Sequence, residues 1–395
     1  MHAKLFLTLL AVLTVASMLC LRLRPIRAGQ ETSGADYQVL EPIRNGSLTV
    51  FPVVASKSYP TGEFLTLDDG LRSGEVVVTE YGNMRGLVRR PNAPVVEQQS
   101  ARVNQLVLVN NSKRPLLLLA GEIVAGGKQD RVIGMDRIVP AESDPIDLSV
   151  FCVEPGRWVA SSDRFGTSGA TYGSVAGGGN GAVPSPNASG GTLMAQPSVR
   201  AKAMGDKDQS QVWAEVKKQQ QSMASEVVTV EAAPASPSGG SAASQINSTS
   251  SYAVVMENKA VKQEVDKIAK PIEQNYQSLI KQLRDRHAVG VVVAVNGRVI
   301  WSDVFASTEL LEKYWPKLVR SYASEAVVTR TKDAKATLSE AQAFLENMQG
   351  RRETIESEPG VFRHTEINGD GFKAFALTSL LPKTGFDVHV AKMAE

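Results

Sequence analysis

The chain has 395 residues, of which 43% are hydrophobic and 21% charged, and its formal net charge is +2. Such a chain has enough apolar material for one large or two small folded domains. Its lysines and arginines form no clustered stripe of the kind that binds polyanions, so the sequence predicts no nucleic-acid partner.

Residues 1–28 have the pattern of a secretory signal peptide. An apolar run over residues 5–21 follows Lys4 and precedes three arginines, and we expect cleavage near the small residue Ala28. The arginines oppose translocation, so an uncleaved membrane anchor is the alternative. A lipoprotein is disfavoured because a bulky leucine precedes Cys20. The protein is therefore predicted to be exported, to the periplasm or the cell exterior, and to contact a membrane only if this segment is retained.

Cleavage would also change the charge of the protein. It would remove four basic residues and no acidic ones, so the mature chain would carry a formal charge of −2. Cys152 would be its only cysteine, so no intramolecular disulfide is expected and stability must come from an ordinary hydrophobic core.

Two low-complexity segments divide the remainder of the chain. Residues 165–197 and 232–251 are rich in Gly, Ser, Ala and Pro, so they bury too little apolar area to offset the entropy of ordering and are predicted to be disordered linkers. They separate a β-rich part (37–160), one helix (211–227) and an α/β part (258–395) that belongs to the same or a second domain.

The β-rich part contains several short apolar runs bounded by turn residues. Residues 103–119 include a turn signal at 110–113 between two such runs, which predicts a hairpin of two antiparallel strands. In the helix predicted over 211–227, Val212, Trp213, Val216 and Met223 are available to dock it onto the rest of the protein.

The α/β part alternates amphipathic helices with hairpins. Asn296-Gly297 suits a type I′ turn between strands at 289–295 and 298–305. Pro271 is expected to kink or restart the helix that precedes this hairpin, and Thr308 is expected to cap the helix that follows the hairpin. A capping box predicts a further helix from Thr337 that ends at Gly350.

Later segments predict further strands, with a turn at 368–371 and an alternating strand at 386–390. Sequential hairpins with interspersed helices favour antiparallel pairing over a regular βαβ order. The predicted class is α+β, β-rich, with antiparallel hairpins and packed helices.

The densest polar cluster follows the apolar run 116–120. Its spacing rejects a phosphate-binding loop, because Gly127 stands where lysine is required and Gln129 where Ser or Thr should hold magnesium. One reading is a glycine turn between strands with solvated charges. The functional reading is a ligand site in which Glu122, Gln129 and Arg131 form hydrogen bonds.

A second polar cluster, residues 152–158, follows the apolar run 148–151 and contains a Pro-Gly turn. Cys152 as a nucleophile would need a base, and only His287, His364 and His389 are available histidines, none placed by a motif. A buried structural thiol is the favoured reading, and the ligand spacing of a zinc site is absent. His389 alternates with Asp387, a pairing that is more often structural than catalytic.

The segments 121–131 and 151–158 together resemble the ARPP family, a domain named for its association with ADP-ribosylglycohydrolases and rhodanese-phosphatases. The resemblance is clearest over 103–158 and extends loosely to the hairpin at Asn296-Gly297. Those associations imply a link to NAD or ADP-ribose metabolism, with Gln129, Arg131 and Glu154 around a nucleotide or ribose. The predicted export signal and the two predicted linkers distinguish this sequence from proteins of NAD or ADP-ribose metabolism.

The residues named above are compatible with three functions. The sequence indicates no particular cofactor or metal for any of them. The first is an exported binding module in which the two turns meet and present Glu122, Gln129, Arg131, Glu154 and Arg157 to a small polar ligand. The second is a hydrolase with Glu122 or Asp130 as general base, or, on a weaker signal, Cys152 as nucleophile. The third is a structural protein in which Arg131 and Arg157 brace the strand ends against carboxylates.

Overall fold

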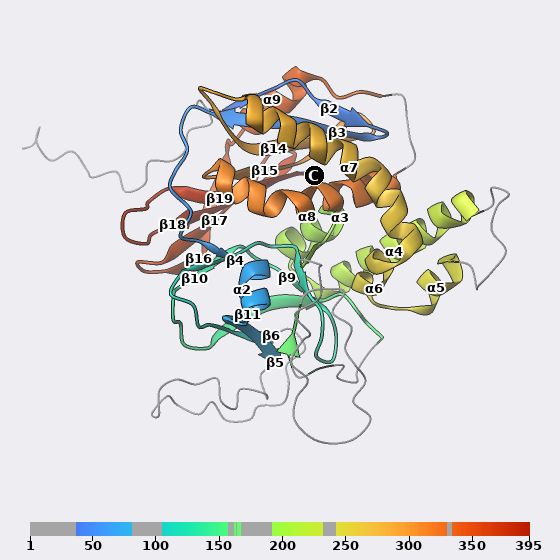
Figure 1. The fold of residues 1–395 in the computed structure, drawn as a ribbon, viewed down its shortest axis with the longest axis horizontal. Helices are drawn as coiled ribbons and strands as arrows, with labels where there is room; N and C mark the ends of the chain where they lie inside the picture. Colours follow the sequence, from blue (N-terminus) through green and yellow to red (C-terminus); the bar gives the residue numbers. More distant parts are fainter. Residues whose placement is uncertain are drawn as a thin grey trace, which may run out of the picture.

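The computed structural model describes residues 37–80, 105–156, 162, 164–166, 192–231, 242–329 and 334–395. The predicted signal peptide and the centres of both predicted linkers lie outside these ranges. Strands and helices are both abundant and almost all strand pairs are antiparallel, so the fold is α+β as predicted (Figure 1).

The largest sheet joins the beginning and the end of the described chain. Its strands lie in the order β1-β3-β14-β15-β19-β18-β17-β16, with β2 paired to β3. Their bounds are β1 (Tyr37–Val39), β2 (Ile43–Asn45), β3 (Leu48–Ala55), β14 (His287–Val295), β15 (Arg298–Phe305), β16 (Gly350–Glu358), β17 (Phe362–Gly369), β18 (Phe372–Ser379) and β19 (Asp387–Ala394).

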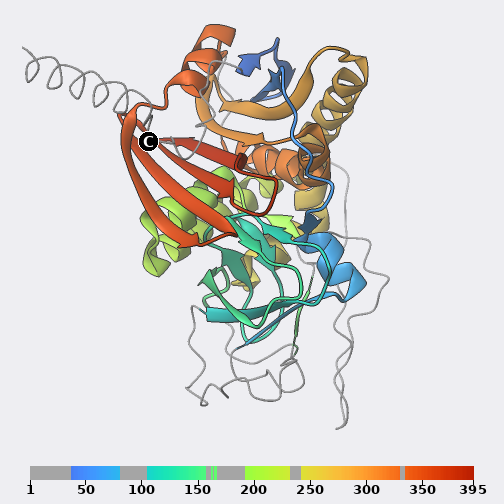
Figure 2. The ribbon, with the colours of Figure 1, turned by 90° about the vertical axis from the view of Figure 1, so that its left-hand side faces the viewer.

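Two smaller sheets lie beside the large one (Figure 2). The first, in the order β10-β7-β4, consists of β4 (Leu65–Thr66), β7 (Leu116–Leu118) and β10 (Arg137–Val139), and β4 with β7 is the one parallel pair among the described strands. The second, in the order β12-β5-β6-β11-β9-β8-β13, consists of β5 (Val76–Glu80), β6 (Gln105–Asn110), β8 (Glu122–Val124), β9 (Arg131–Ile133), β11 (Ile146–Cys152), β12 (Arg164–Phe165) and β13 (Leu193–Met194).

The helices fill the spaces around these sheets. They are α2 (Leu67–Ser73), α3 (Pro197–Ala201), the π-helical turn η2 (Lys202–Asp206), α4 (Gln209–Glu231), α5 (Ala242–Ser248), α6 (Tyr252–Glu257), α7 (Lys259–Gln282), α8 (Thr308–Val327) and α9 (Leu338–Glu346). No helix in the described ranges is both long enough and apolar enough to span a membrane.

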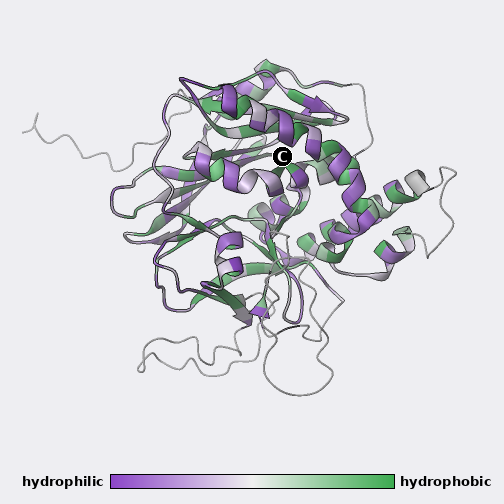
Figure 3. Ribbon diagram, in the orientation of Figure 1, coloured by the Kyte–Doolittle hydropathy of each residue, from purple (hydrophilic) through white to green (hydrophobic). Residues whose placement is uncertain are grey.

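Different helices cover the two faces of the large sheet. Val291 and Val293 of β14 belong to the core with α7 and α8, whereas Val292 and Ala294 pack with α9. Because successive strand residues point to opposite faces, covering both faces explains the nearly continuous apolar run of this strand. Hydrophilic and hydrophobic residues alternate along α7 and α8, as expected for helices with one buried face (Figure 3).

The seven-stranded sheet is also covered on both faces. Its inner residues form one core with β4, β7 and β10, and its other face packs against α3, α4 and α6. Val212 and Val216 of α4 lie in this second core, which confirms the predicted docking of that helix. Helix α4 extends the predicted helix 211–227 at both ends, and α5 occupies residues that were predicted to lie in the second linker.

Several local predictions for the C-terminal part are confirmed. Asn296 and Gly297 have φ values of 51° and 77° and connect β14 to β15, as a type I′ turn requires. The capping box at Thr337 and Glu340 begins α9, and the turn between β17 and β18 is at Asp370 and Gly371, within the predicted range 368–371.

Other boundaries differ from the predictions. Helix α7 runs through Pro271 without restarting, so of the two effects expected of this proline the restart is wrong and the kink stays a prediction. Ser307, not Thr308, caps α8, because Ser307 is still extended and its side chain accepts a hydrogen bond from the Leu310 amide. Helix α9 ends at Glu346, and Gly350 instead begins β16.

The hairpin predicted over residues 103–119 is wrong. Strand β6 pairs with β5 and β11, whereas β7 pairs with β4 and β10 in another sheet. The cause lies at Asn110, whose side-chain nitrogen donates to the carbonyls of Arg114 and Pro140 while its oxygen accepts from Ser112 N at 3.0 Å. These bonds hold a turn that sends the chain into a different sheet instead of folding it back on itself.

Candidate functional site

The two polar turns singled out in the sequence lie side by side. Strand β9 pairs with β11 so that Arg131 is opposite Cys152, and the amide of Val153 donates to the carbonyl of Asp130 at 3.0 Å. The amide of Asp130 in turn donates to Glu154 Oε2 at 3.1 Å. Backbone pairing of two neighbouring strands therefore brings residues 129–131 and 152–154 together.

Gln129 and Cys152 form the centre of this junction. Both are completely buried, and the Cys152 thiol donates to Gln129 Oε1 at 2.9 Å. The amide nitrogen of Gln129 has no hydrogen-bond partner in the part of the chain that the structure describes. Burial raises the pKa of the Cys152 thiol, against smaller opposing contributions from Glu154, Arg131 and Trp213. Complete burial, the hydrogen bond to Gln129 and the raised pKa all disfavour a reactive thiolate, so the structure does not favour Cys152 as a nucleophile.

Asp130 and Arg131 are buried and engaged with their surroundings. Asp130 Oδ1 accepts from the amide of Gly126 at 3.1 Å, and Oδ2 accepts from the hydroxyl of Ser251 at 2.7 Å. Arg131 Nη1 donates to the carbonyl of Asp130 at 3.4 Å. Because both carboxylate oxygens of Asp130 already accept hydrogen bonds, this residue fixes the turn to the start of α6.

Helix α4 covers the junction and adds residues that the sequence did not assign to the site. Gln209 binds the backbone of Cys152 on both sides, accepting from its amide at 2.8 Å and donating to its carbonyl at 2.9 Å. One turn further along α4, Trp213 approaches the Cys152 thiol, and its indole nitrogen has no hydrogen-bond partner among the described residues.

A cavity of about 450 Å³ opens beside Trp213, between α4, α5 and the segment that follows Glu154. Gln220 closes one side of it by donating to the carbonyls of Ile246 and Thr249. The cavity is lined by Pro155, Trp213, Ala214, Val216, Lys217, Gln220, Gln221, Asn247, Thr249 and Ser250. It therefore adjoins the junction but is built mainly from two helices rather than from the predicted turns.

Glu122 lies away from the junction. It is completely buried, its Oε1 pairs with the ammonium of Lys317, and its Oε2 accepts from the amide of Leu119 at 2.8 Å. Lys317 also pairs with Asp68 at 2.9 Å. Burial raises the pKa of Glu122, although Lys317 opposes the shift. One cation shared by two carboxylates ties α2 and β8 to α8, and Glu122 is not among the residues that line the cavity.

Arg157, the remaining predicted ligand-binding residue, lies outside the described residues. Of the other residues predicted to share a ligand site, the structure brings Gln129, Arg131 and Glu154 together, next to the weaker catalytic candidates Asp130 and Cys152, and it separates Glu122 from them.

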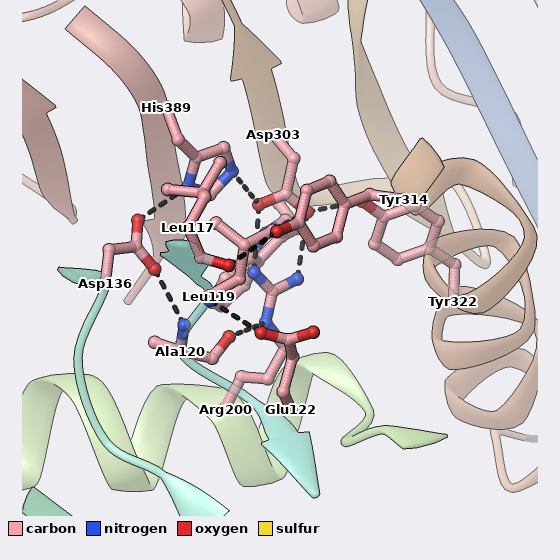
Figure 4. Close-up of polar contacts among 11 residues, drawn as sticks. Leu117, Leu119, Ala120, Glu122, Asp136, Arg200, Asp303, Tyr314, Tyr322 and His389 are labelled. Carbon is pink, nitrogen blue, oxygen red and sulfur yellow. Dashed lines mark hydrogen bonds and ion pairs between the residues drawn. The ribbon is translucent and has the colours of Figure 1, made fainter. Parts of the chain in front are cut away.

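The sequence also missed a buried charged network between the sheets (Figure 4). Arg200 of α3 forms two parallel hydrogen bonds to the Asp303 carboxylate of β15, each 2.9 Å long. His389 of β19 bridges the two acids, with Nε2 at 3.1 Å from Asp303 and Nδ1 at 2.6 Å from Asp136. All four side chains are completely buried.

Neutral groups complete the network. The Trp301 indole nitrogen donates to Asp303 at 2.9 Å and the Tyr322 hydroxyl also donates to it, while Asp136 accepts from the amide of Ala120 at 2.7 Å. Although burial opposes the shift, the two carboxylates raise the pKa of His389 to about 9. With Arg200 and His389 both charged, two cations balance two anions, which offsets the cost of burying them.

Gly121 shows how closely this network is packed. Its φ is +98°, and a Cβ at this position would lie 2.6 Å from Cγ of Arg200. The first glycine of the polar cluster is therefore required both by the left-handed backbone and by the approach of the arginine.

One pairing predicted for the network residues is wrong. His389 was expected to face Asp387 on its own strand, but Asp387 accepts from the hydroxyl of Thr378 at 2.7 Å, and His389 instead reaches Asp136 and Asp303. The usable signal in the sequence was Asp303, the one acidic residue of a strand that is otherwise mostly apolar. Within the described ranges no group of three His, Cys, Asp or Glu side chains is placed to hold a metal ion.

A family model described as the ARG and Rhodanese-Phosphatase-superfamily-associated Protein domain matches residues 36–392. The matched range includes the β-rich part, helix α4 and the α/β part. No curated protein and no solved structure matches the chain.

Proposed function

The chain belongs to the family of the ARG and Rhodanese-Phosphatase-superfamily-associated Protein domain, and from that premise we propose that it is a module that binds a small polar ligand. The observation that supports this most is the cavity between α4 and α5 beside the Gln129–Cys152 junction. Its volume of about 450 Å³ suits a ligand the size of a nucleotide fragment or a sugar.

The exposed lining of the cavity is mainly apolar with a few polar groups, which supports a ligand that combines a ring with polar substituents. Trp213 offers an aromatic surface, and Gln221 and Asn247 offer amide groups. Lys217 has no ion-pair partner among the described residues, so it can contribute its charge to a ligand. We propose a nucleotide or an ADP-ribose-related compound, in keeping with the associations that the family resemblance implies.

Filling the cavity should abolish binding without unfolding the protein. Ala214 lines the cavity on an exposed position of α4, so Ala214→Trp is expected to remove the thermal stabilisation that ADP-ribose, AMP or ribose gives the wild-type protein. Lys218→Trp is the matched control, because Lys218 is on the same helix, is exposed and does not line the cavity. Equal ligand-induced shifts in both variants would place the ligand elsewhere.

The two other functions make different predictions for the same ligands. A hydrolase would release products from ADP-ribose, but both oxygens of Glu122 and of Asp130 already accept hydrogen bonds, which disfavours either as general base. This internal pairing is the observation that favours a structural role for those acids. A structural protein would show no stabilisation by any of the ligands.

We also propose that the protein is exported and loses residues 1–28, on the strength of the apolar run and the small residue that follows it. Sequencing the N-terminus of the protein recovered from the exported fraction is expected to give Gly29 as the first residue. Recovery of the intact chain in the membrane fraction would show that the segment is retained as an anchor.

A further inference from the structure

One end of the nine-stranded sheet carries exposed cations that have no acidic partner. At this end His287, which begins β14, pairs with Ala55, which ends β3, and α7 stops just before β14. The exposed basic residues here are Lys57, Lys281, Arg284 and Arg286. Within the described ranges none of these four side chains forms an ion pair, so their charges are available to a partner.

The earlier part of α7 shows a different arrangement. Lys267 pairs with Glu264 at 2.6 Å, Lys270 pairs with Asp266 at 3.1 Å, and Lys262 pairs with Glu257. This part of the helix lies near the opposite end of the sheet, because Asn45 of β2 donates to the carbonyls of residues 267 and 268. Cations of the same helix are therefore paired at one end of the sheet and unpaired at the other.

The acids at the cationic end are partly engaged. Glu309 pairs with Lys313 at 3.3 Å, and Asp387 accepts from the Thr378 hydroxyl at 2.7 Å. The exposed acids of this end that form no ion pair with described residues are Glu63, Asp285 and Glu312. With Lys383, which is described next, the unpaired cations outnumber these acids.

An exposed apolar loop lies at the same end. It follows β18, and it contains Leu380, which is 37% exposed, and Lys383. The ring of Phe386 at the end of this loop stacks on Tyr59 with 4.4 Å between centroids, and the amide of Tyr59 donates to the carbonyl of Ala306. These contacts join the loop to the segment that follows β3, which carries Lys57.

The described chain also begins at this end. Tyr37 pairs with Ala55, and Arg286 donates to the side chain of Gln38. Residues 22–36 separate Tyr37 from the apolar run 5–21, and a fully extended chain of that length spans at most about 50 Å. A membrane that holds the apolar run before cleavage would therefore be within reach of the cations.

We propose that this end of the sheet binds an anionic lipid surface, with the cations at the headgroups and Leu380 at the boundary of the acyl chains. The proposal is independent of any ligand in the cavity. It also does not require residues 1–28 to be retained, because the cations and the loop belong to the described part of the chain. Each cation close to such a surface strengthens binding by about fivefold.

The first test measures binding to vesicles with the protein that lacks residues 1–28, the form proposed above for the exported protein. Vesicles of phosphatidylglycerol and phosphatidylcholine in equal parts are expected to bind it at least about tenfold more tightly than vesicles of phosphatidylcholine alone. High salt should weaken the binding, because it screens exposed charges. Absence of binding, or equal binding to the two kinds of vesicle, would overturn the proposal.

A pair of double variants locates the surface. Arg284→Gln with Arg286→Gln is expected to weaken binding to the anionic vesicles by about tenfold or more. Lys262→Gln with Lys267→Gln is the matched control, since it removes the same charge from exposed positions of α7 near the other end of the sheet. Equal effects of the two double variants would mean that only net charge matters and would contradict the proposed surface.

The apolar contribution distinguishes a membrane from a soluble polyanion. Leu380→Ser is expected to weaken vesicle binding, whereas Leu338→Ser, which changes a residue of similar exposure (36%) at the start of α9, should not. Double-stranded DNA provides the soluble polyanion. If DNA binds as tightly as the anionic vesicles and Leu380→Ser has no effect, the surface is a general polyanion site and the lipid proposal is overturned.

Discussion

Replacing Arg200 with alanine is expected to lower the free energy of unfolding by about 3–5 kcal/mol, as measured by urea denaturation. The substitution removes two of the hydrogen bonds to Asp303 and leaves two carboxylates against one cation, His389, in a completely buried network. An unbalanced buried charge is costly because the interior solvates it poorly.

Two further variants make this prediction specific. Arg200→Lys keeps the charge but loses the planar fork that matches the carboxylate, so its loss of stability should be smaller than that of Arg200→Ala. Arg351→Ala removes an exposed arginine paired with Glu353 and should leave stability unchanged. A loss below about 1 kcal/mol for Arg200→Ala would show that the network contributes little.

The Arg200 variant should also affect the cavity. Helix α3 continues through η2 towards α4, whose Gln209 and Trp213 build the junction beside the cavity. The network therefore fixes the start of the segment that leads into α4, the helix that lines the cavity. The buried network and the proposed site are therefore connected by one continuous segment of chain.

Stability is expected to fall as the pH rises from about 6.5 to 9, because of His389. Its pKa in the folded protein is about 9, above the usual 6.5, since Asp136 and Asp303 stabilise the charged form despite burial. The folded state therefore holds a proton that the unfolded state releases in this range. The contribution is fully present below about pH 6.5 and amounts to about 3 kcal/mol, which is lost as the pH passes 9.

The comparison that isolates this effect is the His389→Gln variant. Its unfolding free energy should change less with pH than that of the wild-type protein, and the difference between the two profiles should grow smaller from pH 6.5 to 9. Lys392, whose pKa burial lowers to about 8, changes stability in the opposite direction above pH 8, but it is present in both proteins and cancels in the difference. Parallel profiles would contradict the assignment of a charged His389.

His364 predicts a second pH dependence of folding stability, at acid pH. It is buried beside the network, and burial lowers its pKa to about 4. The unfolded chain therefore binds a proton near pH 6.5 that the folded chain does not, so this residue makes stability fall as the pH drops from about 6.5 towards 4. The two histidines act in separate pH ranges and with opposite sign.

Local chemistry in the sequence determined much of the fold. The positive φ values of Asn296 and Gly297, the capping box at Thr337, and the apolar spacing of α7 depend on neighbours a few residues away, and these predictions agree with the structure. Strand pairing also brought residues 129–131 next to 152–154, because β9 and β11 are close in sequence.

Only the tertiary structure decided where the charges meet. Arg200, Asp303 and His389 are distant in sequence, and their attraction arises because α3, β15 and β19 are packed together by hydrophobic burial that no local pattern encodes. The same holds for Glu122, which the sequence grouped with Arg131 but whose partner is Lys317 on α8. The sequence determined which groups are polar, and long-range packing determined which of them share a site, because electrostatic pairing depends on distance in space and not on distance along the chain.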